Sequence, residues 1–146
     1  MTLENLLAIH KLVSQQPDRA ALQRLLDAAA RNLLDAKVTA ISDENRFDAA
    51  YKAIMQCAMA GLWANGYRTA TSQPGHHQTA IQVLPKTIGL EMPTVIVLDA
   101  LRKQRNLSDY EGDPIAPRAV AECIKQAEAL MEYLRAWLAK NKPELL

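Results

Sequence analysis

Residues 102–110 bring together several side chains that could do chemistry. Arg102, Arg105, Asn106 and Asp109 lie three and four residues apart, with the phenol of Tyr110 directly after them. On a helix, side chains at these spacings share one face. Two guanidinium groups beside an amide suit phosphate oxygens, because arginine presents a planar fork of N–H donors. The spacing alone also fits a solvated helix end, in which Asp109 pairs with Arg102 or Arg105.

Two adjacent histidines, His76 and His77, form a second candidate group. Neighbours on a helix point about 100° apart, so the two rings are poorly placed to bind one metal ion. Either could contact an anion, and ordinary loop or capping histidines explain the same pair. We expect no metal site and no cofactor, because the chain has no zinc-ligand spacing and no glycine-rich phosphate loop.

The apolar pattern along the chain predicts helices and no convincing strand. Ser42 is a plausible cap for a long helix that ends at Asn65-Gly66, and a shorter helix begins at His76. Residues 95–98 are apolar and β-branched, but they continue into 99–105 without a break, so we assign them to a helix capped by Thr94. A last helix covers residues 117–140. We therefore predict an all-α fold, an antiparallel helical bundle of five to six helices.

Composition agrees with one domain, residues 1–146, in which an N-terminal helical pair (1–41) precedes a bundle core (42–140). Apolar residues make up 49% of the chain and the formal net charge is +1, so overall charge does not indicate nucleic-acid binding. No apolar run approaches the ~20 residues of a membrane span, and no targeting signal is evident. We expect a cytoplasmic protein that does not bind membranes, with Cys57 and Cys123 reduced and buried.

Residues 105–110 (Arg-Asn-Leu-Ser-Asp-Tyr), between an apolar helix and a long final helix, resemble the signature region of the HEPN superfamily. The resemblance covers residues 46–140. It includes the helix that holds Arg46 and Tyr51, the Gly66-Tyr67 stop, and the helix start at residues 75–77. Members of the family are helical bundles, usually homodimers, marked by an arginine followed after four to six residues by a histidine. In the family this motif lies at the cleft of a symmetric dimer. There it supports metal-independent RNA cleavage, or a toxin role beside a minimal nucleotidyltransferase.

The chain departs from the family motif at its last position. Arg105 and Asn106 match the motif, but Tyr110 stands where the resemblance leads us to expect histidine. In the family the histidine would take a proton from a ribose hydroxyl while the arginine steadies the phosphate. A phenol with a pKa near 10 starts roughly 4 kcal/mol behind as a general base at neutral pH. His76 or His77 could take the place of the missing histidine if their helix lies against Arg105.

The resemblance predicts a HEPN-like RNA- or nucleotide-binding protein in a bacterial toxin–antitoxin or defence module. It implies catalytic positions at Arg105, Asn106 and Tyr110, with Arg102 and one of the two histidines contacting phosphate. We expect weak or divergent ribonuclease activity, or none. Two alternatives stay open: a non-catalytic helical partner of a nucleotidyltransferase or another enzyme, and a DNA-binding regulator.

Overall fold

Helices account for most of the chain in the computed structural model, which describes residues 2–146. In chain order the elements are α1 (Leu3–Ala8), β1 (Leu12–Ser14), α2 (Arg19–Ala36), α3 (Asp43–Ala64), β2 (Tyr67–Thr69), α4 (His76–Gln82), α5 (Leu84–Thr87), α6 (Met92–Glu111), α7 (Pro117–Asn141) and the 3-10 turn η1 (Pro143–Leu145).

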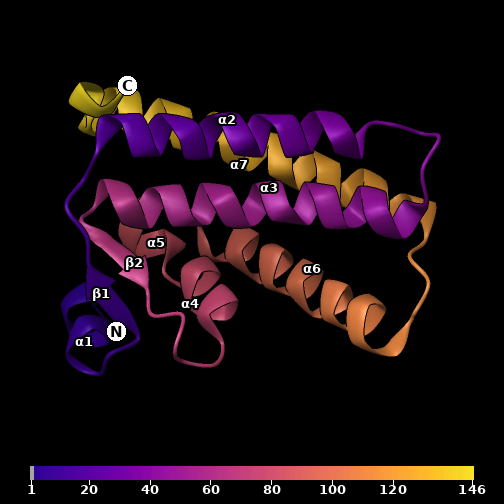
Figure 1. The fold of residues 1–146 in the computed structure, drawn as a ribbon, viewed down its shortest axis with the longest axis horizontal. Coiled ribbons are helices and arrows are strands. Elements are labelled where there is room, and N and C mark those ends of the chain that lie inside the picture. Colours follow the sequence, from indigo (N-terminus) through magenta and orange to yellow (C-terminus); the bar gives the residue numbers. More distant parts are fainter. Residues whose placement is uncertain (1) are drawn as a thin grey trace.

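The long helix α3 lies at the centre of the bundle. Its buried side chains include immediate neighbours such as Ala53, Ile54 and Met55, so apolar groups cover it on nearly every side. A helix that is apolar all round must be enclosed by other elements. α2 and α7 pack along one side of it, and α4, α5 and α6 lie against the other (Figure 1). Ser42 caps α3 as predicted, because its side chain accepts a hydrogen bond from the amide of Asn45.

The helices α2 and α7, on one side of α3, each bury a single stripe of side chains against it. These stripes confirm the helical periodicity expected from the sequence. In α2 the buried residues are Leu22, Leu26, Ala29, Leu33 and Ala36; in α7 they are Val120, Cys123, Ala127, Leu130, Leu134 and Leu138. Cys57 and Cys123 are both buried free thiols, and burial raises the pKa of each to about 12.

Only the first half of α6 is packed into the core. Its buried residues are Val95, Leu98 and Leu101, and the helix runs without interruption through residues 95–98, which confirms their assignment to a helix. The prediction that Thr94 caps this helix is wrong. The helix already begins at Met92, and Pro93 in its first turn has no N–H that would need a capping acceptor.

The expectation of a chain without strands needs a correction. β1 and β2 form a small antiparallel pair, in which Leu12, Val13 and Ser14 face Thr69, Arg68 and Tyr67. His10, at a positive φ of 63°, turns the chain after α1, so Leu12 belongs to a strand. Strands of three residues are too short to show an alternating pattern, and their pairing joins segments far apart in sequence.

The all-α bundle is confirmed, with seven α-helices in residues 2–146 where five or six were expected. The additional helix arises because the segment predicted as one helix divides at Val83, just before Pro85, into α4 and α5. Within residues 2–146, none of the helices combines the length and the apolar character that crossing a membrane requires.

We expect Leu26→Ala to lower the free energy of unfolding by about 2–5 kcal/mol, because the fully buried side chain would leave a cavity between α2 and α3. Urea denaturation followed by circular dichroism measures the change. Leu34→Ala is the matched control on the same helix, since Leu34 is 66% exposed and should change stability by less than about 0.5 kcal/mol. Equal effects of the two substitutions would contradict the packing of α2 on α3.

Candidate functional site

Charged side chains of both signs follow one another along α6, from Asp99 to Asp109. Nε of Arg102 lies 2.8 Å from Oδ1 of Asp99, and Nζ of Lys103 lies 3.5 Å from the other oxygen of that carboxylate. Burial acts to raise the pKa of Asp99. The hydrogen bond and charge of Arg102, together with Lys103, outweigh burial and lower it. Asp99 therefore stays ionised and holds the guanidinium of Arg102 in place.

Arg105 lies one turn further along α6 and joins this helix to α3. Its Nε is 2.8 Å from Oδ2 of Asp109 on the same helix and 3.4 Å from Oδ1 of Asp48 on α3. Its guanidinium carbon is 5.4 Å from the centre of the Tyr51 ring, a cation–π contact. Nη1 donates to the amide oxygen of Asn106 at 3.4 Å. Because both carboxylates contact Nε, the outer Nη edge of the guanidinium keeps N–H donors for an anion.

Tyr51 connects Arg105 to the histidine pair. The side chain is 2% exposed, and its hydroxyl lies 3.3 Å from Nδ1 of His77 on α4. Burial raises the pKa of Tyr51 to about 12, although the charges of Arg105 and Arg102 oppose this shift. Burial lowers the pKa of His77, and the neighbouring His76, Arg105 and Arg102 lower it further. At neutral pH the phenol is therefore protonated and the His77 ring is uncharged.

With both rings uncharged, the hydrogen bond between them can run in either direction, according to the tautomer of His77. Among residues 2–146, Nδ1 of His77 is the one hydrogen-bond partner of the Tyr51 hydroxyl, so a hydroxyl that did not donate to it would leave its own hydrogen without an acceptor. We therefore infer that the hydroxyl donates to Nδ1 and that the neutral imidazole carries its proton on Nε2. His77 then offers an N–H donor and not a base. The ring of His76 packs edge-on against it, with the centroids 4.6 Å apart.

Of the residues predicted from the sequence, the structure brings Arg102, Arg105, Asn106 and His77 into one region. Tyr110 is not part of it. Five residues beyond Arg105, it lies about 140° further around the helix, and it is 79% exposed. The contacts of Asp48, Asp99 and Tyr51 were missed. Tyr51 was named only as part of the helix that takes part in the HEPN resemblance, and its spacing of three from Asp48 was the signal for a shared face.

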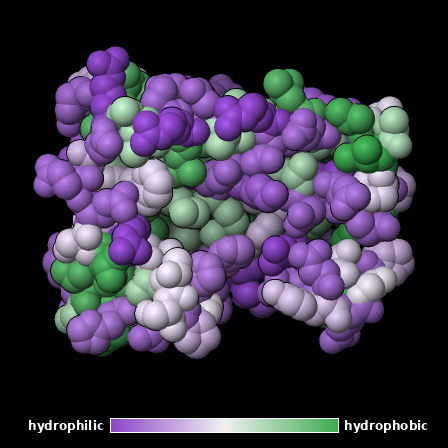
Figure 2. All heavy atoms as spheres, in the orientation of Figure 1, coloured by the Kyte–Doolittle hydropathy of each residue, from purple (hydrophilic) through white to green (hydrophobic). Residues whose placement is uncertain are grey.

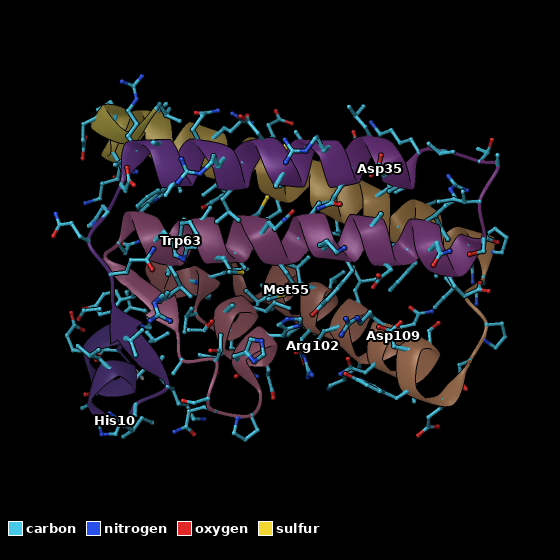
Figure 3. The ribbon with its side chains drawn as sticks, in the orientation of Figure 1. His10, Asp35, Met55, Trp63, Arg102 and Asp109 are labelled. Atoms are coloured by element: carbon cyan, nitrogen blue, oxygen red, sulfur yellow. The ribbon has the colours of Figure 1, made fainter. Side chains whose placement is uncertain are left out.

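This group of polar side chains, which we call the Arg105 cluster, consists of Asp48, Tyr51, His77, Arg102, Arg105 and Asp109. Figure 3 shows Arg102 in the angle between α4 and α6, below the part of α3 where Met55 is labelled, and Asp109 further along α6. Figure 2 shows this face of the molecule hollowed over α3, with hydrophilic residues along the α6 side. In the part of the chain that the structure describes, no group of three or more His, Cys, Asp or Glu side chains could hold a metal ion.

Comparison with known proteins adds no relative: no protein-family model matches the chain, and no curated protein is significantly similar to it. The chemistry of the Arg105 cluster therefore rests on its geometry.

We expect long-range ¹H–¹⁵N spectra of the ¹⁵N-labelled protein to show the neutral His77 ring protonated at Nε2 near pH 7. Its midpoint of titration should lie below the ordinary value of 6.5. Tyr51→Phe removes the donor to Nδ1 and should allow the other neutral tautomer to appear.

Tyr67→Phe is the control, because this half-buried tyrosine lies on β2 outside the Arg105 cluster. A wild-type His77 protonated at Nδ1, or a titration midpoint above 6.5, would contradict the assignment.

Proposed function

We propose that this chain is a HEPN-like protein that binds a phosphate group of single-stranded RNA or of a nucleotide at the Arg105 cluster. The observation that carries the proposal is the contact of Tyr51 with both Arg105 and His77. Through this contact, a guanidinium with free Nη donors and a neutral imidazole N–H are held beside the same ring. Directed N–H donors from two elements can share one phosphate.

The charge balance of the cluster favours recognition at short range. Arg102 pairs with Asp99, and Arg105 pairs with Asp48 and Asp109, so the positive charges are largely compensated. A compensated group attracts a distant polyanion weakly, whereas its N–H donors still act at hydrogen-bond distance. This supports binding of a nucleotide or a short single strand, and it argues against the DNA-binding regulator, which would need an extended basic surface.

Binding is better supported than cleavage. An RNA 2′-hydroxyl needs a general base, but a His77 ring that accepts a hydrogen bond at Nδ1 and carries its proton on Nε2 presents no free nitrogen lone pair to a substrate. Burial and the nearby arginines also disfavour a charged ring, since they lower the pKa of His77. Arg105 and His77 could stabilise negative charge on a phosphate, but the carboxylates beside Arg105 are weak bases that are already paired with its guanidinium. Weak metal-independent cleavage, or none, is the consequence.

A homodimer would form through the outer face of α6. Met92, Ile96, Leu107 and Tyr110 are 55%, 64%, 46% and 79% exposed, and their spacing puts them along one side of that helix. An exposed apolar stripe is typical of an interface. Arg105 points from another side of α6, about 140° around the helix from Tyr110, so the stripe offers a dimer interface that is separate from the Arg105 cluster. In the dimer that the HEPN resemblance implies, by contrast, the motif lies at the cleft between the two copies.

The rival function is a non-catalytic partner of a nucleotidyltransferase or another enzyme. The exposure of Tyr110, outside the Arg105 cluster, favours it. In that case the stripe on α6 would bind the other protein, and the chain alone would neither bind nucleotides nor pair with itself.

We expect Arg102→Gln/Arg105→Gln to weaken binding of a fluorescein-labelled single-stranded RNA at least about 100-fold, because two charge-assisted hydrogen bonds that contribute roughly 1.5–3 kcal/mol each are lost. Fluorescence anisotropy at fixed salt measures the change. Lys103→Gln is the matched control: its side chain is 68% exposed on the same helix, and its loss should cost less than about threefold.

The same preparations should cut mixed RNA slowly or not at all. Equal affinities of the double variant and the wild type would exclude the Arg105 cluster as the binding site. Robust cleavage that Arg105→Ala abolishes would refute the weak-nuclease proposal.

We expect Ile96→Glu/Leu107→Glu to convert a dimer into a monomer, because two buried carboxylates per copy would lie in the apolar interface. Light scattering coupled to size-exclusion chromatography gives the mass. Leu34→Glu, on the exposed side of α2, is the control and should leave the dimer intact. A wild-type protein that is monomeric at about 100 μM would contradict the dimer, since stable interfaces have dissociation constants well below this value.

A further inference from the structure

The far side of α4 from the Arg105 cluster borders a separate cavity of about 450 Å³. Its apolar walls come from three elements: Leu6 of α1, Val83 at the end of α4, and Pro85 of α5. Figure 1 shows α1 and β1 standing to one side of the bundle, next to β2 and α4. The volume lies within the range of roughly 300–1,000 Å³ that is usual for small-molecule sites.

The charged residues that line this cavity are all of one sign. They are Lys11, in the turn between α1 and β1, and Lys86 of α5; no Asp or Glu is among the lining residues. Neither lysine forms an ion pair with any residue in the range 2–146. Two like charges around one opening repel each other, and an anion placed between them would remove that cost.

The remaining lining suits an apolar ligand body. Leu6 and Val83 are 7% and 5% exposed, so the inner wall is part of the hydrophobic core surface. Met92, which is 55% exposed at the start of α6, lines the outer part of the cavity. Methionine adapts its shape to apolar ligands, because its side chain is flexible and polarisable.

The short turn that carries Lys11 is fixed by its backbone conformation and by a hydrogen bond. His10 precedes it at a positive φ of 63°, and the carbonyl of Lys11 accepts a hydrogen bond from the amide of Ala70 at 3.0 Å. The next residue, Leu12, pairs with Thr69 where β1 meets β2, so the hydrogen bond of Lys11 lies at the end of this strand pair. The backbone of Lys11 is therefore held in position on the cavity wall.

We propose that this cavity binds a small amphipathic anion. Its apolar part would lie against Leu6 and Val83, and its carboxylate or phosphate group would contact Lys11 and Lys86. The site shares no residue with the Arg105 cluster, and it shares Met92 with the apolar stripe on α6.

The test uses the fluorescent sulfonate 8-anilinonaphthalene-1-sulfonate and the full chain. We expect saturable binding with one probe per chain. Lys11→Gln/Lys86→Gln should weaken this binding at least about tenfold, because it removes both charge-assisted contacts. Gln82→Glu, a nearly isosteric change in the cavity lining, should also weaken it by adding a negative charge. Lys125→Gln/Lys140→Gln on α7 removes the same charge elsewhere and should change the affinity less than about twofold.

Competition identifies the head group. Octanoate and octyl phosphate should displace the probe, and displacement by only one of them would assign the ligand to carboxylates or to phosphates. Displacement by 1-octanol as strong as by the anions would overturn the proposal. Unchanged affinity in Lys11→Gln/Lys86→Gln would also overturn it, as would loss of probe binding in Arg102→Gln/Arg105→Gln.

Discussion

The buried hydroxyl of Tyr51 is the constraint on which the arrangement of the Arg105 cluster depends. A hydroxyl taken out of water without a partner costs about 1–3 kcal/mol, and His77 is the partner that the fold supplies. The start of α4 must therefore stay against α3. The face of the same ring lies under Arg105, which ties α6 to the same point. One side chain thus holds three helices in register, and the groups that could contact an anion are the groups that it touches.

The carboxylates around Arg105 and Arg102 explain how two guanidinium groups can lie half-buried on a short stretch of helix. Arg102 and Arg105 side chains are only 14% and 23% exposed, so each loses much of its hydration. Asp99, Asp48 and Asp109 replace part of that hydration, and all three contact Nε. These contacts also orient the two guanidinium groups. Because the guanidiniums are already held in place, their Nη edges stay available, and less side-chain entropy is lost when a ligand binds.

Sequence periodicity was sufficient for the helices that bury a continuous stripe. A helical pair was predicted in residues 1–41, α3 was predicted from its cap at Ser42 and its end at Asn65-Gly66, and α7 was predicted over residues 117–140. It failed where a contact between distant segments decides the structure. Leu12 pairs with Thr69, and no local signal announces that pairing. For the same reason spacing could place Arg102, Arg105 and Asn106 on one face, but it could not reveal that Asp48 and Tyr51 lie against them from α3. Tyr110 is exposed because α6 has no buried residue after Leu101, and the sequence did not predict where the helix would leave the core.

The proton on Nε2 of His77 limits what a single copy of this chain can do to RNA. With Arg105 it forms a pair of donors, which stabilises a phosphate equally before and during reaction unless a base activates the attacking hydroxyl. Tyr110 does not supply that base within the chain, because it is 79% exposed and lies about 140° around α6 from Arg105. Phosphate binding needs only the groups that Tyr51 already holds together, whereas cleavage also needs a base. For this reason binding is the function that the geometry supports.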